Sequence, residues 1–528
     1  MRQFDAPEVQ KIERCFGRVA WVLTLTLAVL TVPATGFAKD DLAQPIRVSP
    51  DGHYLMQSNG EPFFWLGDWA WELFKTPTRD DVDKYLKDRA NKGFTLILAP
   101  ATGDFAPLSR TNPYGQTPFL KNDGEHPNPR YFENVDWIIE RAAHYGLRFA
   151  LLPSWGNLVT GDVEDKIPQI LTSATAESYG RWLGSRYRNK GILWVLGGDT
   201  NPIMPKSVRI RVDAQGKWMI DRGASDLSMV DYRPVYDALA RGILEGDSPS
   251  AFITYHPTVG TYSGVAQPRT SLYFGDRSWL QMNMLQSGHT VNAAMYSRFG
   301  LDFGWVATFN YEPVTAEYYS NPIRPVIDGE TRFEDLAIDI EKGRGYWKAY
   351  DSRNGAYHAL FAGAAGHNYG NESLGLFYDP VRNPVPLELE WKPWQEALNS
   401  PGSAQMQHVK ALMLSRPYFT RIPDQSLVLG DQGQGDAHIS ATRDKDGSYA
   451  MIYLPKGQAV TADLSKISGS MAAGWWFDPR TGSATKIDEI FPTAGAKTFR
   501  SPSSGPEDDW ILVIDNAQRS FQAPGKSN

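Results

Sequence analysis

Short apolar runs alternate with amphipathic segments from residue 60 onwards. The first amphipathic segment begins at Thr78, with Asp81 three residues later as in a capping box, and continues at helical spacing to Lys92-Gly93. The runs between such segments are apolar on both faces, which is typical of parallel strands covered by helices on both sides. This regular alternation of strand and helix predicts a parallel sheet.

Eight such runs follow one another, which favours a (β/α)8 barrel over an open, doubly wound sheet. The predicted strands are Phe63–Asp68, Phe94–Ala99, Leu147–Leu152, Ile192–Leu196, Phe252–His256, Gln281–Leu285, Pro325–Ile327 and Ala359–Ala362. A polar insertion, Pro202–Asp231, interrupts the series, and its segments Val208–Val212 and Trp218–Ile220 predict a hairpin. No Gly-x-Gly-x-x-Gly follows the first strand, so a dinucleotide-binding fold would lack its phosphate loop.

The pattern changes near Tyr418. Beyond it, short apolar-rich runs such as Tyr449–Leu454 and Trp510–Ile514 are separated by Gly, Pro, Asp and Ser, which predicts a small all-β sandwich. We therefore expect an α/β chain, with a TIM barrel over residues 39–417 and a β-sandwich accessory domain over residues 418–528.

The first 38 residues have the features of a secretory signal peptide. Basic residues at positions 11 to 18 precede the apolar stretch Val19–Ala34, and Gly36-Phe37-Ala38 is a small-x-small cleavage site. We expect a secreted or periplasmic protein with no membrane attachment after cleavage; an uncleaved anchor is the alternative. The only cysteine, Cys15, lies in this segment, so the mature protein would contain no disulfide and no thiolate site.

Composition narrows the possible functions. The net charge of −7 and the lack of a long Lys/Arg run argue against a nucleic-acid partner. Aromatic residues make up 12% of the chain, including 17 Trp, and aromatic faces can bind sugar rings as well as fill a core. No Gly-x-Ser-x-Gly elbow and no phosphate-binding loop is present, so serine hydrolases and nucleotide hydrolases are not indicated.

Two acidic residues stand at the ends of predicted strands, Asp199 after the fourth and Glu330 after the seventh. Barrel enzymes carry their chemistry at the C-terminal ends of the strands, and a carboxyl pair there can cleave a glycosidic bond. In retaining barrel glycosidases the acid on the fourth strand protonates the leaving oxygen and the acid on the seventh attacks the anomeric carbon. Alternatively, both residues are caps, Asp199 of the following loop and Glu330 of a helix near Phe333.

Polar and aromatic residues near the other strand ends could complete a sugar-binding ring, although each could instead be a packing or capping residue. We predict as substrate-binding residues Asp68, Trp69, Trp155, Asn157, His256, Gln286, His289 and His367. The histidines show no metal-ligand spacing, so we expect no metal and no cofactor.

Six segments carry a family resemblance: FFWLGDWAWELF, YFENVDWIIERAAHYGLRFALLPSWG, ILWVLGGDTNP, MLQSGH, NPIRPVIDGETRFED and AGAAGHNYG. Through them the chain resembles glycoside hydrolase family 140. These are apiosidase-like barrels related to clan A, with a C-terminal domain named for collagen binding. The resemblance implies Asp199 as acid/base and Glu330 as nucleophile. Many clan A relatives have Asn-Glu at the fourth strand, where this chain has Gly198-Asp199.

The sequence therefore predicts a retaining glycosidase acting on an oligo- or polysaccharide of the cell wall. The resemblance implies release of apiose from pectin side chains. A catalytically inactive carbohydrate- or matrix-binding protein on the same scaffold is the alternative.

Overall fold

The computed structural model describes most of the chain after residue 41. The described residues are 42–103, 108–121, 123–161, 167–207, 209–212, 218–258, 269–289, 310–338, 345–384 and 391–526. The predicted signal peptide lies outside these residues. Within them, every helix is too short or too polar to cross a membrane.

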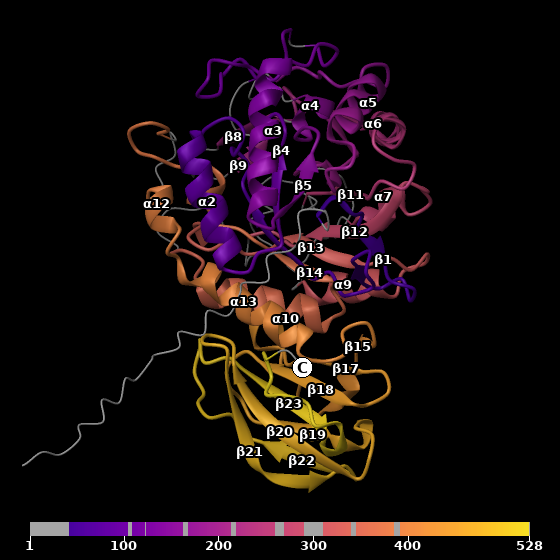
Figure 1. The fold of residues 1–528 in the computed structure, drawn as a ribbon, viewed down its shortest axis with the longest axis vertical. Helices are drawn as coiled ribbons and strands as arrows, with labels where there is room; N and C mark the ends of the chain where they lie inside the picture. The colour runs from indigo at the N-terminus through magenta and orange to yellow at the C-terminus, as the bar shows by residue number, and fades with distance from the viewer. Residues whose placement is uncertain are drawn as a thin grey trace, which may run out of the picture. The chain divides into compact units, whose positions relative to one another are not determined.

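Eight parallel strands form the barrel predicted from the sequence (Figure 1). They are β3 (Trp65–Trp69), β4 (Leu96–Pro100), β5 (Arg148–Leu152), β6 (Leu193–Gly197), β11 (Ile253–His256), β12 (Leu280–Gln286), β13 (Val326–Glu330) and β14 (Gly366–Tyr369). From β3 to β13 each strand pairs with its neighbour in chain order, and β14 pairs with β3. The N–H of Ala365 donates to the carbonyl of Val326 (2.8 Å), which brings β13 and β14 together and nearly closes the ring.

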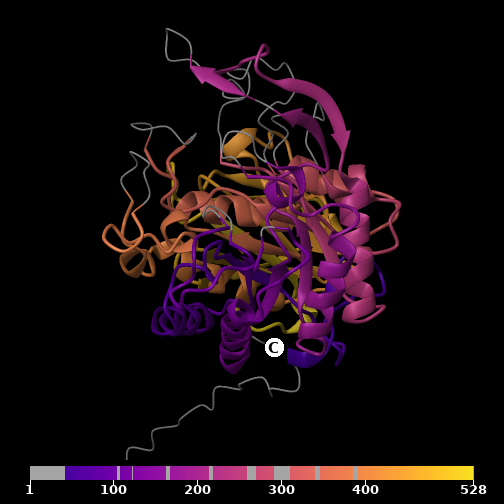
Figure 2. The ribbon, with the colours of Figure 1, turned by 90° about the horizontal axis from the view of Figure 1, so that it is seen from above.

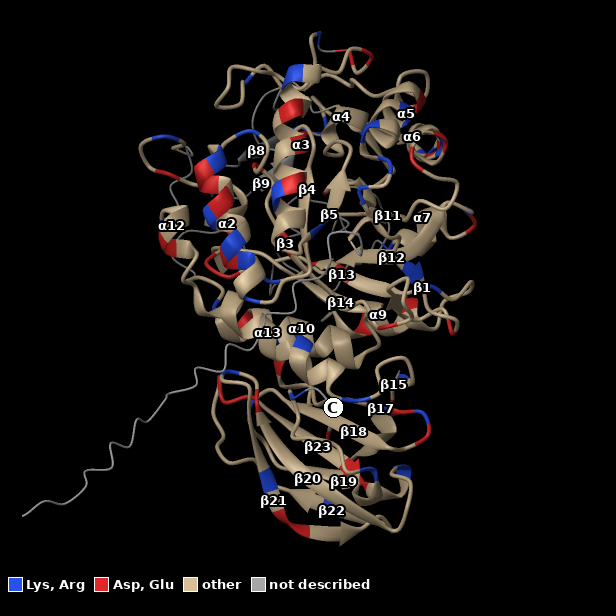
Figure 3. Ribbon diagram, viewed as in Figure 1, with Lys and Arg blue, Asp and Glu red and all other residues tan. Residues whose placement is uncertain are grey.

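Helices surround this ring and connect its strands. They are α2 (Arg79–Asn91), α3 (Pro129–His144), α4 (Asn157–Thr160), α5 (Ala176–Tyr187), α6 (Arg233–Gly246), α7 (Thr270–Phe274), α9 (Tyr311–Tyr318), α10 (Ala349–Phe361), α11 (Glu372–Gly375), α12 (Trp394–Ala397) and α13 (Pro401–Leu414). The predicted capping box of α2 is confirmed, since Thr78 and Asp81 bind each other's backbone N–H. Figure 3 shows both charge signs along α2 and α3, while the strands carry few charges.

The prediction for the eighth strand is wrong. Residues Ala359–Ala362 form the end of α10, and the strand is β14, which begins at Gly366. Helix α10 is buried on nearly all sides. The last turn of this buried helix, Ala359–Phe361, is apolar on every side, so in sequence it resembles a buried strand.

Two small ribbons, β7 (Ile203–Ser207) with β10 (Asp226–Asp231) and β8 (Ile210–Val212) with β9 (Trp218–Ile220), form the insertion after β6. The predicted hairpin is therefore confirmed, and the insertion stands out from the barrel (Figure 2). A further short pair, β1 (Arg47–Val48) and β2 (Leu55–Met56), precedes the barrel.

Two antiparallel sheets form the predicted sandwich after α13. The larger sheet contains β15 (Arg421–Pro423), β17 (Ser440–Asp444), β18 (Tyr449–Leu454), β20 (Met471–Asp478), β21 (Ser483–Pro492) and β23 (Trp510–Asn516). The smaller one contains β16 (Val428–Leu429), β19 (Val460–Asp463) and β22 (Ala496–Phe499).

The central strands of the larger sheet are buried on both faces. In β18, Ala450, Ile452 and Leu454 belong to the sandwich core, whereas Tyr449 and Tyr453 belong to the core of the barrel. Successive side chains of a strand point to opposite faces, so one face of the sheet packs on its partner sheet and the other on the barrel. The sandwich is therefore part of one continuous hydrophobic structure with the barrel.

Candidate active site

The backbone at the end of β6 has an unusual conformation that places Asp199 at the mouth of the barrel. Gly197, Gly198 and Asp199 have φ angles of +83°, +104° and +47°. Such angles favour glycine and strain other residues, and strain of this kind gathers at functional sites. A Cβ atom on Gly198 would lie 2.6 Å from Cε3 of Trp155. The Trp155 ring therefore leaves no room for a larger side chain at position 198.

His256, the last residue of β11, lies between the two acids. Its Nδ1 accepts a hydrogen bond from the backbone N–H of Asp199 (3.4 Å), and its Nε2 lies 3.5 Å from Oε2 of Glu330. Burial lowers the pKa of His256 although the charges of Glu330 and Asp199 raise it. The ring is therefore neutral near pH 7, with its proton on Nε2, the nitrogen facing Glu330.

Glu330 ends β13 and is held by a second histidine. Nε2 of His289 lies 2.8 Å from Oε1 of Glu330, in hydrogen-bonding distance. Burial alone would lower the pKa of His289, but the hydrogen bond and the charge of Glu330 raise it above its ordinary value. Oε2 of Glu330 is buried and receives no hydrogen bond from any residue that the structure describes.

Asp199 lies in a different environment from Glu330. Its Oδ1 accepts a hydrogen bond from the hydroxyl of Thr258 (2.6 Å). Part of its side chain reaches solvent, but the surrounding protein raises the pKa of Asp199, and the negative charge of Glu330 raises it further. Hydrogen bonds from Thr258 and Gln286, together with His256, act in the opposite direction. The raised pKa favours a proton on Asp199, which an acid/base residue needs.

Tryptophan rings line the barrel beside these acids. The Nε1–H of Trp69 donates to the carbonyl of Gly329 (2.8 Å), next to Glu330. The Trp69 ring stands nearly perpendicular to the rings of His256 and Trp155, with centroids 5.2 and 5.8 Å away, and stacks on Trp71 at 5.9 Å. The rings give the site rigid apolar walls.

Comparison with known families agrees with this arrangement. The model described as "Apiosidase-like, catalytic domain" matches residues 49–420. The chain belongs to the apiosidase-like family. A second model, described as "Putative collagen-binding domain of a collagenase", matches residues 422–515, the sandwich of this apiosidase-like chain.

Solved structures of glycoside hydrolases resemble the apiosidase-like chain over nearly its whole length. One, named "Glycoside hydrolase", is 29% identical with a TM-score of 0.74, and the match covers 91% of this chain and 98% of the other. A glycoside hydrolase family 5 protein from Bacteroides vulgatus is 28% identical with a TM-score of 0.76, covering 92% and 95%. No curated protein matches the sequence. The family and these structures support glycoside hydrolase activity.

Two of the predicted substrate-binding residues of this apiosidase-like chain point away from the site. Asp68 accepts a hydrogen bond from Tyr85 (2.6 Å) and forms an ion pair with Arg89 (3.5 Å), both on the outer helix α2. His367 pairs with Leu66 in the sheet and, by strand alternation, shares the outer face with Asp68. Both predictions are corrected, because an apolar run does not reveal which alternate residues face inward.

The structure brings together the other predicted residues, Trp69, Trp155, His256, Gln286 and His289, around Asp199 and Glu330. Gln286 ends β12 opposite Glu330 in the sheet and hydrogen-bonds to Asp199. Asn157 begins α4 two residues after Trp155, half-buried, and its side chain hydrogen-bonds to none of the described residues.

Three residues of the site escaped the sequence analysis. Thr258 binds Asp199, and Glu372 adds a third carboxyl group close to the pair. Asp328 binds the hydroxyl of Ser287 (2.7 Å) and so fixes the loop that carries His289. Of the three, only Glu372 could have been found from the sequence, because it closely follows the eighth strand, where barrel enzymes carry site residues. The sequence pattern predicts that strand too early in the chain, so Glu372 was missed.

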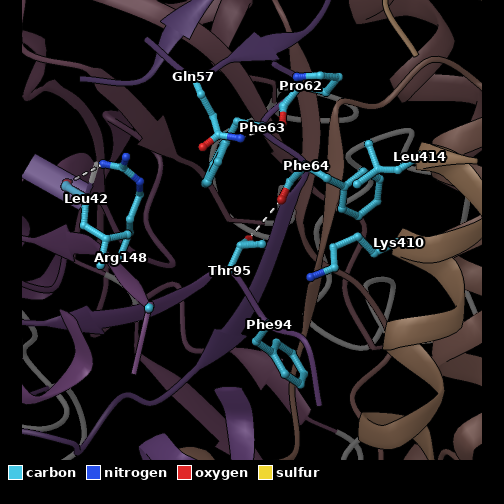
Figure 4. Close-up of a pocket in the computed structure, with 11 residues that line it drawn as sticks. Leu42, Gln57, Pro62, Phe63, Phe64, Phe94, Thr95, Arg148, Lys410 and Leu414 are labelled. Atoms are coloured by element: carbon cyan, nitrogen blue, oxygen red, sulfur yellow. Dashed lines mark hydrogen bonds between the residues drawn. The ribbon is translucent and has the colours of Figure 1, made fainter. Parts of the chain in front are cut away.

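Two further features lie apart from the acids. Among the described residues, only Asp123, Glu125 and His126 bring three potential metal ligands within 4.8 Å of one another, in the connection between β4 and α3. A cavity of about 160 Å³ opens at the N-terminal ends of β3, β4 and β5 (Figure 4). Phe63, Phe94 and Lys410 help to line it, at the end of the barrel opposite the acid pair.

Proposed function

We propose that this chain hydrolyses a glycosidic bond with retention of configuration, with Asp199 as acid/base and Glu330 as nucleophile. One observation carries the proposal. The two carboxyl groups stand at the C-terminal ends of the fourth and seventh barrel strands, act on each other electrostatically and have His256 between them. A complete acid pair favours hydrolysis over the alternative of an inactive binding barrel.

The environments of the two acids suit the two steps of a double displacement. In the first step Oε2 of Glu330 attacks the anomeric carbon while Asp199 gives its proton to the leaving oxygen. The raised pKa of Asp199 keeps that proton available, and His289 holds Glu330 through its other oxygen. In the second step Asp199 takes a proton from water, and that water releases the sugar from Glu330.

For the substrate we propose a cell-wall glycan, with apiose of a pectin side chain as the sugar released. The family description and the resemblance of the strand-end motifs support apiose. The walls formed by Trp69 and Trp155 suit the apolar face of a sugar ring. Export through the signal peptide is part of the proposal, and N-terminal sequencing of the exported protein tests it.

Two single variants test the roles of the acids. We expect Asp199→Asn and Glu330→Gln each to lower kcat about 10²- to 10⁴-fold on pectin oligosaccharides. Glu312→Gln is the matched control, because Glu312 is exposed on α9. Near-normal turnover by either variant would exclude its assigned role.

The stereochemistry is tested separately. Proton NMR of the fresh reaction should show the sugar first released with the anomeric configuration of the substrate. Release of the opposite anomer would overturn the nucleophile role of Glu330 and leave hydrolysis itself intact.

A further inference from the structure

Glu372 lies at the mouth of the barrel in a turn fixed to the loop that follows Glu330. It opens helix α11, three residues after the end of β14. The N–H of Glu334 donates to the carbonyl of Gly370 (3.0 Å), and Asn371 donates to the carboxylate of Asp335 (2.9 Å). The position of the Glu372 turn is therefore tied to that of the β13 loop.

The loop after β3 holds the same turn from the other side. The N–H of Glu72 donates to the carbonyl of Gly375 (3.0 Å), and the ring of Trp71 covers Gly375 so closely that no side chain would fit there. The Trp71 ring also packs against Phe333 (5.4 Å), which in turn packs against His289 (4.5 Å). Contacts from the loops after β3 and β13 thus hold the Glu372 turn near His289, which binds Glu330.

Among the residues that the structure describes, the carboxyl group of Glu372 has no hydrogen-bonding partner. It is half-buried and forms no hydrogen bond with the part of the chain that the structure describes. Burial raises the pKa of Glu372 to about 7, with His289 opposing this and the charges of Glu330 and Asp199 adding to it. These three groups act on it most strongly, so the carboxyl group of Glu372 lies close to the acid pair.

We propose that Glu372 determines sugar specificity: it binds a hydroxyl of the sugar at the cleavage position and excludes sugars that carry a carboxylate. This inference rests on the proposed function. The ionisable groups that act most strongly on Asp199, His256 and His289 are carboxyl and imidazole groups, without an ammonium or guanidinium among them.

The charge of the site gives the physical reason. A uronic acid would bring a fourth carboxylate close to the other three, and no Lys or Arg is among the described groups that act most strongly on Asp199, His256 and His289. An uncharged sugar brings hydroxyl groups instead. A hydroxyl can donate to Glu372 when it is ionised and accept from it when it is protonated, so the contact persists on both sides of pH 7.

The test compares Glu372→Gln with wild type on 4-nitrophenyl β-D-apioside and on apiose-containing pectin oligosaccharides. We expect KM to rise about tenfold with a smaller change in kcat. The titration near pH 7 should disappear from the pH profile of kcat/KM, while Glu372→Asp should retain it. Free galactose should inhibit wild type at least about tenfold more strongly than galacturonate, and Glu372→Gln should narrow that ratio.

Glu396→Gln is the matched control, since Glu396 is exposed on α12, and it should behave as wild type. The inference would be overturned if Glu372→Gln had the KM, the pH profile and the inhibition ratio of the wild type. The proposed function would still stand in that case if Asp199→Asn and Glu330→Gln remain inactive. Wild-type protein inactive on every glycoside would overturn both. Circular dichroism confirms that each variant is folded before its kinetics are interpreted.

Discussion

Two ion pairs between the barrel and the sandwich have the same length, but one is buried and the other is exposed. Comparing them tests how much a buried ion pair contributes to holding the barrel and the sandwich together. Arg353 of α10 binds Asp509 next to β23 at 2.7 Å, with 4% and 0% of the two side chains exposed. Lys348 binds Glu507 at the same distance, with 65% and 53% exposed. Coulomb attraction at a fixed distance depends on the surrounding dielectric, so the two pairs should differ in energy.

Removing Asp509 leaves the guanidinium of Arg353 buried, with its two hydrogen bonds to the carboxylate lost. We expect Asp509→Ala to lower the free energy of unfolding by about 3–5 kcal/mol, the usual cost of an uncompensated buried charge. Glu507→Ala should cost less than about 1 kcal/mol, because both partners remain in water. Burial raises the pKa of Asp509 and the neighbouring Arg353 lowers it, so the ion pair offsets part of the cost of burying the carboxylate.

Urea unfolding followed by tryptophan fluorescence measures both variants. The barrel and the sandwich share one core, so we expect a single transition whose midpoint shifts strongly for Asp509→Ala and weakly for Glu507→Ala. The double variant Arg353→Met with Asp509→Leu should be more stable than Asp509→Ala, because no lone charge remains buried. This reasoning would be refuted if the two alanine variants lost the same free energy of unfolding, or if the double variant were less stable than Asp509→Ala.

Three further predictions follow from single positions. Gly198→Asn should place its Cβ against Trp155 and strain a positive φ, lowering stability by about 1–3 kcal/mol and kcat with it; an unchanged Tm would contradict this. Thr258→Val removes a hydrogen bond that lowers the pKa of Asp199, so the alkaline limb of the kcat/KM profile should move to higher pH; a shift to lower pH would exclude Asp199 as the acid. Burial lowers the pKa of His367 from 6.5 to about 3, so the unfolded state binds more protons than the folded state between these two pH values. Below about pH 6.5 this residue should therefore lower the free energy of unfolding by about 1.4 kcal/mol for each unit by which the pH falls. In acid denaturation, His367→Leu should reduce this dependence on pH.

The positions of the two acids along the barrel could be predicted from the sequence. Asp199 and Glu330 each close an apolar run, and runs that are apolar on both faces occur in parallel strands covered by helices. Counting such runs placed the acids on the fourth and seventh strands. The run predicted as the eighth strand belongs to α10, but this error did not change the numbering of the strands that carry the acids. The change near Tyr418 from helical spacing to short strands likewise predicted the sandwich.

The tertiary structure alone decided which way the side chains point. Both faces of a buried strand are apolar, so the sequence carries no signal for the phase of alternation, and Asp68 and His367 turned out to face the outer helices. Contacts between distant loops are equally invisible in the sequence: Thr258 reaches Asp199, and Glu372 is held between the loops after β3 and β13. Local pattern determined the strand on which each acid stands, while packing between strands determined the partners and the charge environment of that acid.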